Sequence, residues 1–99
     1  MIAISSAPTF RITLEGHPDQ AYRRELPLRV ADALRRGDRR VVIDCAAWSQ
    51  LDLIVLSALV SCARHCDEEE AEFELENLDG TMRSRILALR LGDRLRIRA

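Results

Sequence analysis

The sequence contains no lysine, and all 15 of its basic residues are arginine. The acidic residues number 16 and bring the formal net charge to −1, so the overall charge does not favour a nucleic acid or an anionic membrane as partner. Glycine occurs only 4 times, and no glycine-rich phosphate-binding loop is present. With 47% apolar and 31% charged residues, the 99-residue composition is ordinary for a folded protein. We therefore expect one small globular domain, residues 1–99, with a single core.

Long apolar runs are also missing. The longest, LIVLSALVSCA at residues 53–63, is well short of the roughly 20 residues that a helix needs to cross a bilayer. Residues 1–8 are short and uncharged, so we do not expect a signal peptide. Without such a signal, Cys45, Cys62 and Cys66 are expected to be reduced, buried thiols. These features predict a cytoplasmic protein that does not insert into a membrane.

Two segments have the clearest strand patterns. Residues 9–14 alternate strictly, which places Phe10, Ile12 and Leu14 on one face of a strand that is buried on that side. Residues 40–45 form a β-branched run between polar flanks, which is typical of a central parallel strand. Both segments therefore predict a sheet.

Three shorter segments are further strand candidates. Residues 72–76 alternate again, and residues 1–5 and 95–97 are weaker candidates for edge strands. The acidic cluster at residues 67–70, which precedes the first of these, predicts a solvated loop.

Three segments have helical signals. The first predicted helix begins between Tyr22 and Pro27, places Pro27 in its first turn, and ends at Arg36 before the stop residue Gly37. Its apolar residues fall on one helical face: Leu26, Val30, Ala33 and Leu34.

The second and third predicted helices begin with capping residues. Asp52 is a good N-cap for a helix that reaches about Cys66. Either Asp79 or Thr81 caps a third helix, in which Met82, Ile86 and Leu89 follow helical spacing, and Gly92 is expected to end it. The resulting order predicts an α/β fold, an open, mixed but mostly parallel sheet of four to five strands covered by helices.

Four phrases in this order resemble the STAS domain, the fold of bacterial anti-sigma factor antagonists. They are LEGHPD at residues 14–19, RVVID at 40–44, LD at 51–52 and LRLGDRL at 89–95. In that family they correspond to a strand ending in a turn, a second strand, a helix start, and the exit of a terminal helix. The resemblance implies a STAS-like fold and a non-enzymatic regulatory module for protein–protein interaction in transcription signalling. Its partner would be an anti-sigma factor with a kinase-like fold.

The chain departs from the family pattern at the helix start. In the family a Ser or Thr followed by Gly comes after the capping Asp, and one hydroxyl accepts phosphate from a partner kinase. Here Asp52 is followed by Leu53 and Ile54, neither of which can carry phosphate. The loop after His17 also differs from the family's small-residue pattern. A phosphate-controlled switch at this position is therefore not expected.

The helical wheel after Asp52 has two faces. The predicted core stripe contains Leu56, Leu59, Val60 and Ala63, and the opposite, more polar stripe contains Leu53, Ser57, Ser61 and Arg64. Leu53 thus heads a polar face, with Ile54 near its edge. One interpretation is a permanently dephospho-like binding surface, and the other is that both side chains pack under a neighbouring loop. The predicted protein-binding residues are Gly16, His17, Asp19, Ser49, Asp52, Leu53, Ile54 and Ser57.

Other residues have simpler interpretations. Ser57 and Ser49 are weak candidates for a relocated phosphoacceptor, and a mid-helix serine more often bonds to its own helix. Thr81 is expected to cap its helix, although Arg83 and Arg85 could hold a phosphate there.

Metal binding, catalysis and cofactors are not expected. Cys62, His65 and Cys66 lie within two helical turns, but no second ligand pair follows them at finger-like spacing, so structural cysteines are favoured over zinc. His17 beside Asp19 lacks a placed nucleophile, which disfavours acid–base catalysis. The arginines at residues 35, 36, 39 and 40 form a basic cluster that needs no partner.

Trp48, the only tryptophan, is predicted to anchor the core just before the second helix, with an interface role as the alternative. Two other roles stay open for the whole chain. STAS-like chains also serve as accessory subunits of lipid-transport ABC systems and as scaffolds of stress-sensing complexes. The apolar face of the second helix is also compatible with a homodimer.

Overall fold

The computed structural model describes residues 8–14, 19–49 and 52–97. The elements in these residues follow the order β1 (Thr9–Thr13), α1 (Gln20–Arg35), β2 (Arg40–Asp44), α2 (Leu53–Glu68), β3 (Glu72–Glu76) and α3 (Gly80–Ala88). The predicted α/β class and the alternation of strand and helix are confirmed.

The described strands form one open sheet of three in the order β1-β2-β3. Both pairs are parallel, with Phe10 beside Val41 and Val41 beside Phe73, so β2 is the central strand as predicted. Parallel neighbours require crossover helices, and α1 and α2 are those crossovers. The mixed pairing and the count of four to five strands that the sequence suggested are not found among these residues.

The two extra strand candidates have different outcomes. Residues 1–5 lie outside the described residues. Residues 95–97 belong to a turn instead of a strand, so that prediction is wrong. The reason is local: the Leu95 N–H donates to Leu91 O at 3.0 Å and the Ile97 N–H to Gly92 O at 2.8 Å, while Arg96 has a φ of 56°. The backbone groups are thus used within the turn.

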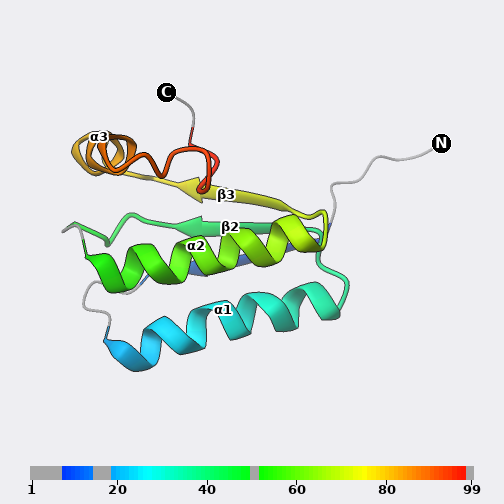
Figure 1. Ribbon diagram of the computed structural model, residues 1–99. Coiled ribbons are helices and arrows are strands. Elements are labelled where there is room, and N and C mark those ends of the chain that lie inside the picture. The colour runs from blue at the N-terminus through cyan, green and yellow to red at the C-terminus, as the bar shows by residue number, and fades with distance from the viewer. Residues whose placement is uncertain (1–7, 15–18, 50–51, 98–99) are drawn as a thin grey trace.

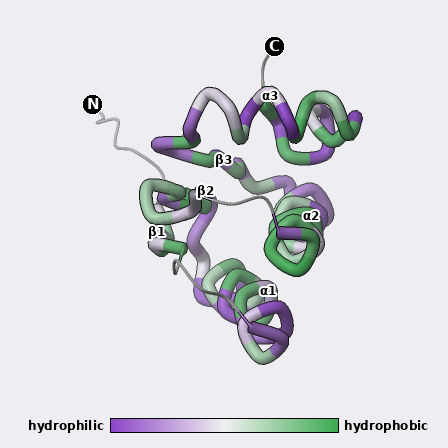
Figure 2. Tube along the Cα trace, turned by 90° about the vertical axis from the view of Figure 1, so that its left-hand side faces the viewer, coloured by the Kyte–Doolittle hydropathy of each residue, from purple (hydrophilic) through white to green (hydrophobic). Residues whose placement is uncertain are grey.

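The helices lie in two places relative to the sheet. Figure 2 shows α1 and α2 on the same face of the sheet, and α3 next to β3 at the edge opposite β1. In Figure 1 the first turns of α1 and α2 lie at the same end of the sheet, where the parallel strands end. This end is the edge at which open α/β folds usually place their sites.

The core lies between the sheet and the two crossover helices and also includes side chains from α3 and the turn after it. It includes the predicted inner face of β1, with Ile12 and Leu14 buried and Phe10 half-buried against them. The largest fully buried side chains are Leu14, Leu26, Ile43, Leu59, Ile86 and Leu95. The predicted apolar face of α1 is confirmed, since Leu26, Val30, Ala33 and Leu34 are all buried.

The start of α1 corrects the sequence prediction. The helix begins at Gln20, before the predicted Tyr22–Pro27 interval, because Asp19 is its N-cap and accepts the Tyr22 N–H at 3.0 Å. Pro27 therefore lies in the interior of the helix and not in its first turn. The other end agrees with the prediction, since Gly37, at a φ of 106°, follows the C-cap Arg36 in the left-handed conformation that favours glycine.

Two predicted helix ends are also shifted. The acidic cluster is not all loop, because α2 continues through Asp67 to Glu68. Gly92 does not end α3, which stops at Ala88 with Leu89 as its C-cap. A Cβ at Gly92 would lie 2.6 Å from Leu87 Cδ2, so a larger residue there would require the end of the Leu87 side chain to move.

Among the described residues, no helix is both long and apolar enough to cross a bilayer.

Candidate functional site

The first turn of α2 is set by one side chain. Asp52 has an extended backbone, with φ −136° and ψ 123°, and its carboxylate accepts the Ile54 N–H at 2.7 Å. Its carbonyl accepts the Leu56 N–H at 2.9 Å, which begins the helical ladder. This arrangement is that of an N-cap, as predicted, and it satisfies an N–H that the helix itself cannot pair.

The residues after the cap differ sharply in exposure. Leu53 is 74% exposed, Ile54 is half-buried, and Val55 and Leu56 are buried. The interpretation in which Leu53 packs under a neighbouring loop is therefore wrong for that side chain, because the helical rotation turns it away from the core. We call the segment formed by Asp52, Leu53 and Ile54, with Leu53 as its exposed side chain, the α2 tip.

The wheel prediction for the rest of α2 is largely confirmed. Below the α2 tip, Ser57 and Arg64 are exposed and Ser61 is half-buried. On the opposite face Leu56, Leu59 and Ala63 are buried, while Val60 is only partly covered. The exposed stripe of α2 thus starts with a large apolar side chain and continues with small polar ones.

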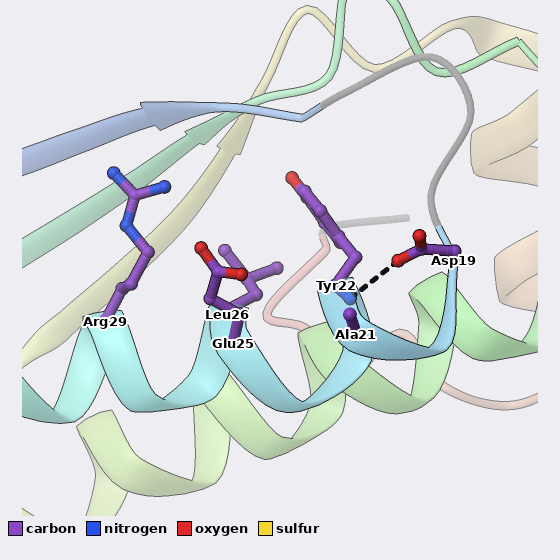
Figure 3. Close-up of a pocket in the computed structure, with 6 residues that line it drawn as sticks. All are labelled: Asp19, Ala21, Tyr22, Glu25, Leu26 and Arg29. Atoms are coloured by element: carbon purple, nitrogen blue, oxygen red, sulfur yellow. Dashed lines mark hydrogen bonds between the residues drawn. The ribbon is translucent and has the colours of Figure 1, made fainter.

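The residues predicted to flank the α2 tip are only partly described. Gly16 and His17 lie outside the described residues, and Ser49 is exposed. Asp19 is engaged as the N-cap of α1 and lines a hollow of about 240 Å³ together with Tyr22, Glu25 and Arg29 (Figure 3). The structure therefore places Asp19 and Asp52 at the same end of the sheet, each bound to its own helix (Figure 1).

Carboxylates cap all three described helices. Asp19, Asp52 and Asp79 each accept a backbone N–H from the first turn of α1, α2 and α3, respectively. A helix N-terminus attracts anions through free N–H groups and its partial positive charge. Here a carboxylate already occupies that position in each case, which disfavours the binding of a further anion at these helix starts.

The carboxyl end of β2 adds another charge. Asp44 Oδ1 accepts the Asn77 side-chain N–H and the Ala46 backbone N–H, both at 3.0 Å. These two bonds, with the larger contribution from Asn77, lower the pKa of Asp44 below its ordinary value. The Asp44 carboxylate is therefore ionised and held in place beside the segment that leads to α2.

Trp48 packs into the core just before α2. It is only 2% exposed, which confirms the predicted core position and leaves no surface for an interface contact. Among the described residues, its Nε1–H is the buried side-chain polar atom that has no hydrogen-bond partner. Leaving such a donor unpaired typically costs about 1–3 kcal/mol.

The cysteines are free and buried, as expected. Burial raises the pKa of Cys45 and Cys62 to about 12 and that of Cys66 to about 11, so all three are protonated thiols at neutral pH. Within the described part of the chain, no cluster of three or more His, Cys, Asp or Glu side chains is arranged to hold a metal ion. All three thiols pack within the hydrophobic core.

The hydroxyl at α3 is not a cap. Asp79 caps that helix, accepting the Thr81 and Met82 N–H groups at 3.0 and 3.3 Å, so the preference for Thr81 as cap is wrong. Aspartate is the better placed residue because it lies one position before the first helical residue. Thr81, Arg83 and Arg85 are all exposed on the outside of α3.

Part of the arginine cluster has a structural role. Arg39 donates to Leu34 O at 2.7 Å and to Glu69 O at 3.1 Å, which ties the end of α1 to the end of α2. Arg35 pairs with Asp32 and Arg40 with Glu74. This region therefore supports the fold and lies away from the α2 tip.

The sequence missed one feature of this surface. A hollow of about 400 Å³ runs beside the exposed stripe of α2 and is closed on one side by Leu91, from the segment after α3. Leu28 and Leu89 are further exposed leucines, at 64% and 47%. A helical wheel of α2 could indicate the stripe but not the distant segment that turns it into a groove.

The comparisons with known proteins agree with this architecture. A family model described as "Mlab, STAS domain" matches residues 4–97, nearly the whole chain. No curated protein and no solved structure matches the chain. The resemblance to STAS domains that the sequence phrases indicated is therefore confirmed.

Proposed function

Since the chain belongs to the STAS domain family, we propose that it is a non-enzymatic regulatory module that binds a protein partner through the α2 tip. Domains of this family are generally non-catalytic binding modules. The observation that supports the α2 tip as the contact is the 74% exposure of Leu53 beside a firmly capped helix start.

The energetics favour a protein contact. Covering the exposed parts of Leu53 and Ile54 contributes roughly 1–3 kcal/mol before the costs of association. The α2 tip needs little rearrangement to bind, because Asp52 already fixes the first turn. A rigid apolar side chain on an ordered helix is the kind of anchor around which protein interfaces are built.

The partner we propose first is an anti-sigma factor with a kinase-like fold, as in the antagonists of this family. Such a kinase would find no hydroxyl at Leu53 or Ile54, so binding through the α2 tip would not be switched off there. Phosphorylation would add a near-double negative charge at a contact surface. We therefore propose that this module binds its partner without control by phosphorylation at the α2 tip.

A charge substitution at the α2 tip tests the contact. Leu53→Glu should weaken partner binding by at least tenfold, since it removes apolar contact area and adds a carboxylate beside Asp52. Leu28→Glu on α1 is the matched control, because Leu28 is a similarly exposed leucine on another helix. Binding would be measured by pull-down from cells of the source organism and then by calorimetry with the recovered partner. Equal binding by Leu53→Glu and wild type would remove the α2 tip as the site.

The second candidate function is a permanent accessory or scaffold subunit of a larger assembly, such as a lipid-transport ABC system or a stress-sensing complex. An apolar surface that cannot be modified at its centre favours this role. Copurification separates the two functions. Recovery of a membrane permease or ATPase supports assembly, whereas recovery of a kinase-like protein supports signalling. A homodimer through the same surface would be detected by sedimentation of the purified chain.

The absence of a switch is tested by phosphate mapping. After incubation with the cognate kinase, mass spectrometry should find no phosphate on Ser49, Ser57 or Thr81. All three hydroxyl residues are exposed, so their accessibility does not prevent the reaction. Phosphate on Ser49 or Ser57 would show that the switch has moved along the chain.

A further inference from the structure

Two adjacent hollows lie along the exposed stripe of α2. The hollow of about 400 Å³ beside Leu53, Val60 and Leu91 adjoins a second hollow of about 210 Å³ beside Asp67 and Arg94. Val60 and Arg64 line both hollows, so the two lie side by side. We call the pair of hollows the α2 groove; together they extend from the α2 tip to the last turn of the helix.

The chemistry of the α2 groove changes along its length. Leu53 is exposed at one end, and Val60 and Leu91 are half-buried in the middle. Arg64 and Arg94, both exposed, lie at the other end. Asp67 also lines this end, but its carboxylate is paired with Arg96. The groove is therefore apolar at the α2 tip and basic at the far end.

The two arginines at the far end are distinguished by their place beside the groove and not by their pairing, since other exposed arginines such as Arg23 and Arg24 also form no ion pair among the described residues. Arg11, Arg40 and Arg96 each pair with a carboxylate. Within residues 8–14, 19–49 and 52–97, Arg64 and Arg94 have no such ion pair. Two unpaired guanidinium groups beside an apolar groove are complementary to a ligand that is apolar along its length and acidic at one end.

We propose that the α2 groove binds an amphipathic helix of the partner protein, with apolar side chains against Leu53, Val60 and Leu91 and a carboxylate facing Arg64 and Arg94. This inference rests on the proposed function, because it extends the α2 tip into a longer site and specifies the chemistry of the partner. Helix-in-groove binding is a common mode of recognition, with anchors spaced at helical intervals.

The length of the groove fixes the spacing in the partner helix. Leu53 and Arg64 are 11 residues apart on α2, which corresponds to about 16 Å along the axis. Residues eleven positions apart lie on nearly the same face of a helix. The partner helix should therefore carry apolar residues at i, i+4 and i+7 and an acidic residue near i+11.

A protein helix fits this surface better than an anionic membrane does. The three residues after Asp67 are Glu68, Glu69 and Glu70, all exposed and close to the basic end in sequence. A flat anionic surface that reached Arg64 and Arg94 would also approach these carboxylates. A narrow helix in the groove can contact the arginines without covering the acidic turn.

The experiment uses the full chain and two designed helical peptides of about 18 residues, which differ only at i+11. One peptide has glutamate there and the other has lysine, with leucine at i, i+4 and i+7 in both. Fluorescence anisotropy at low and high salt should show the glutamate peptide binding about tenfold more tightly at low salt, with a smaller difference at high salt. Vesicles of phosphatidylcholine with phosphatidylserine are the comparison for a lipid surface.

Three variants separate this inference from the proposed function. Arg64→Glu combined with Arg94→Glu should reverse the preference between the peptides, whereas Arg23→Glu combined with Arg24→Glu on α1 should leave it unchanged. Leu53→Glu should weaken the binding of both peptides.

If the two peptides bind equally and Leu53→Glu still weakens both, the role of Arg64 and Arg94 is wrong, and the α2 tip remains the contact. Arginine dependence without an effect of Leu53→Glu would instead remove the α2 tip. No saturable binding of the glutamate peptide, or arginine-dependent binding to the vesicles alone, would overturn the proposal.

Discussion

The starts of α2 and α3 have the same cap and present different surfaces. Asp52 and Asp79 both have extended backbones and accept N–H groups from the first turn of their helices. After Asp52 the chain continues with Leu53 and Ile54, whereas after Asp79 it continues with Gly80 and Thr81. The first start therefore exposes a large apolar side chain, and the second exposes a small polar surface.

The difference between the two helix starts shows that the cap and the residues after it have separate roles. The capping carboxylate decides where the helix begins, and the next two residues decide what that end offers to another molecule. α3 retains a hydroxyl in its first turn, and α2 has none before Ser57. A capped helix start is therefore compatible with either a modifiable or a permanently apolar surface.

The largest expected effect comes from the buried side of α2, on which the position of the α2 tip depends. Leu59 is fully buried, so Leu59→Ala should lower the free energy of unfolding by about 2–5 kcal/mol. Leu53→Ala should change it by no more than about 0.5 kcal/mol, because that side chain is largely exposed. Urea denaturation of both variants measures the contrast. Similar losses in the two would mean that Leu53 supports the fold.

An exchange of the two helix starts should have the next largest effect. Leu53→Gly with Ile54→Thr gives α2 the same first residues as α3. This variant should lower the free energy of unfolding by about 1–2 kcal/mol, because glycine is a poor helix former and the half-buried Ile54 loses apolar contacts. Partner binding should be lost. The reverse exchange, Gly80→Leu with Thr81→Ile, should be tolerated, because a Cβ at Gly80 meets no atom within 4 Å. Thermal unfolding and binding assays check both, and retained binding by the first variant would contradict the role of the α2 tip.

The two caps should have similar and smaller effects. Asp52→Ala and Asp79→Ala each remove the acceptor for first-turn N–H groups, at a cost of about 1 kcal/mol. Asp79 accepts two N–H groups, so its variant should be at least as destabilised. Denaturant titration gives both values. If only one of the two substitutions lowers the free energy of unfolding, the two caps are not equivalent.

The smallest effect concerns the carboxylates at the ends of the strands that lead into α2 and α3. The hydrogen bond from Asn77 lowers the pKa of Asp44, and the bond from Arg11 lowers the pKa of Glu76. Because both pKa values are lower in the folded chain, each group stabilises the fold above its unfolded pKa. That stabilisation is lost as the pH falls through the folded pKa. Stability should therefore fall from about pH 5 towards pH 3.

The control for this pH dependence is the removal of each charge in turn. Asp44→Asn and Glu76→Gln should each make the free energy of unfolding depend less on pH over that range. Chemical denaturation at a series of pH values measures the slope. An unchanged slope in both variants would assign the acid sensitivity to other groups.

The strands were predictable from two different patterns. Alternation in residues 9–14 and 72–76 and the β-branched run at residues 40–45 located all three described strands. The start of α2 was equally clear, since an aspartate stands directly before a long apolar run. The start of α1 was not, because Pro27 gave a misleading first-turn signal and Asp19 was assigned to a turn.

The candidate site was predictable only as far as it lies on one element. Helical rotation from Asp52 correctly placed Leu53 on the exposed stripe. The other wall of the α2 groove comes from Leu91 and Arg94, which follow α3 and reach α2 only after the chain has folded.

The buried Trp48 gives this protein an internal optical probe. It is the only indole in the chain, so ultraviolet excitation above the tyrosine band reports on one place, the segment that leads to the α2 tip. An indole enclosed by apolar side chains, with its N–H unpaired, emits at short wavelengths, and contact with water shifts the emission to the red. Loosening of the segment before α2 would thus become visible in the emission colour of the unlabelled protein.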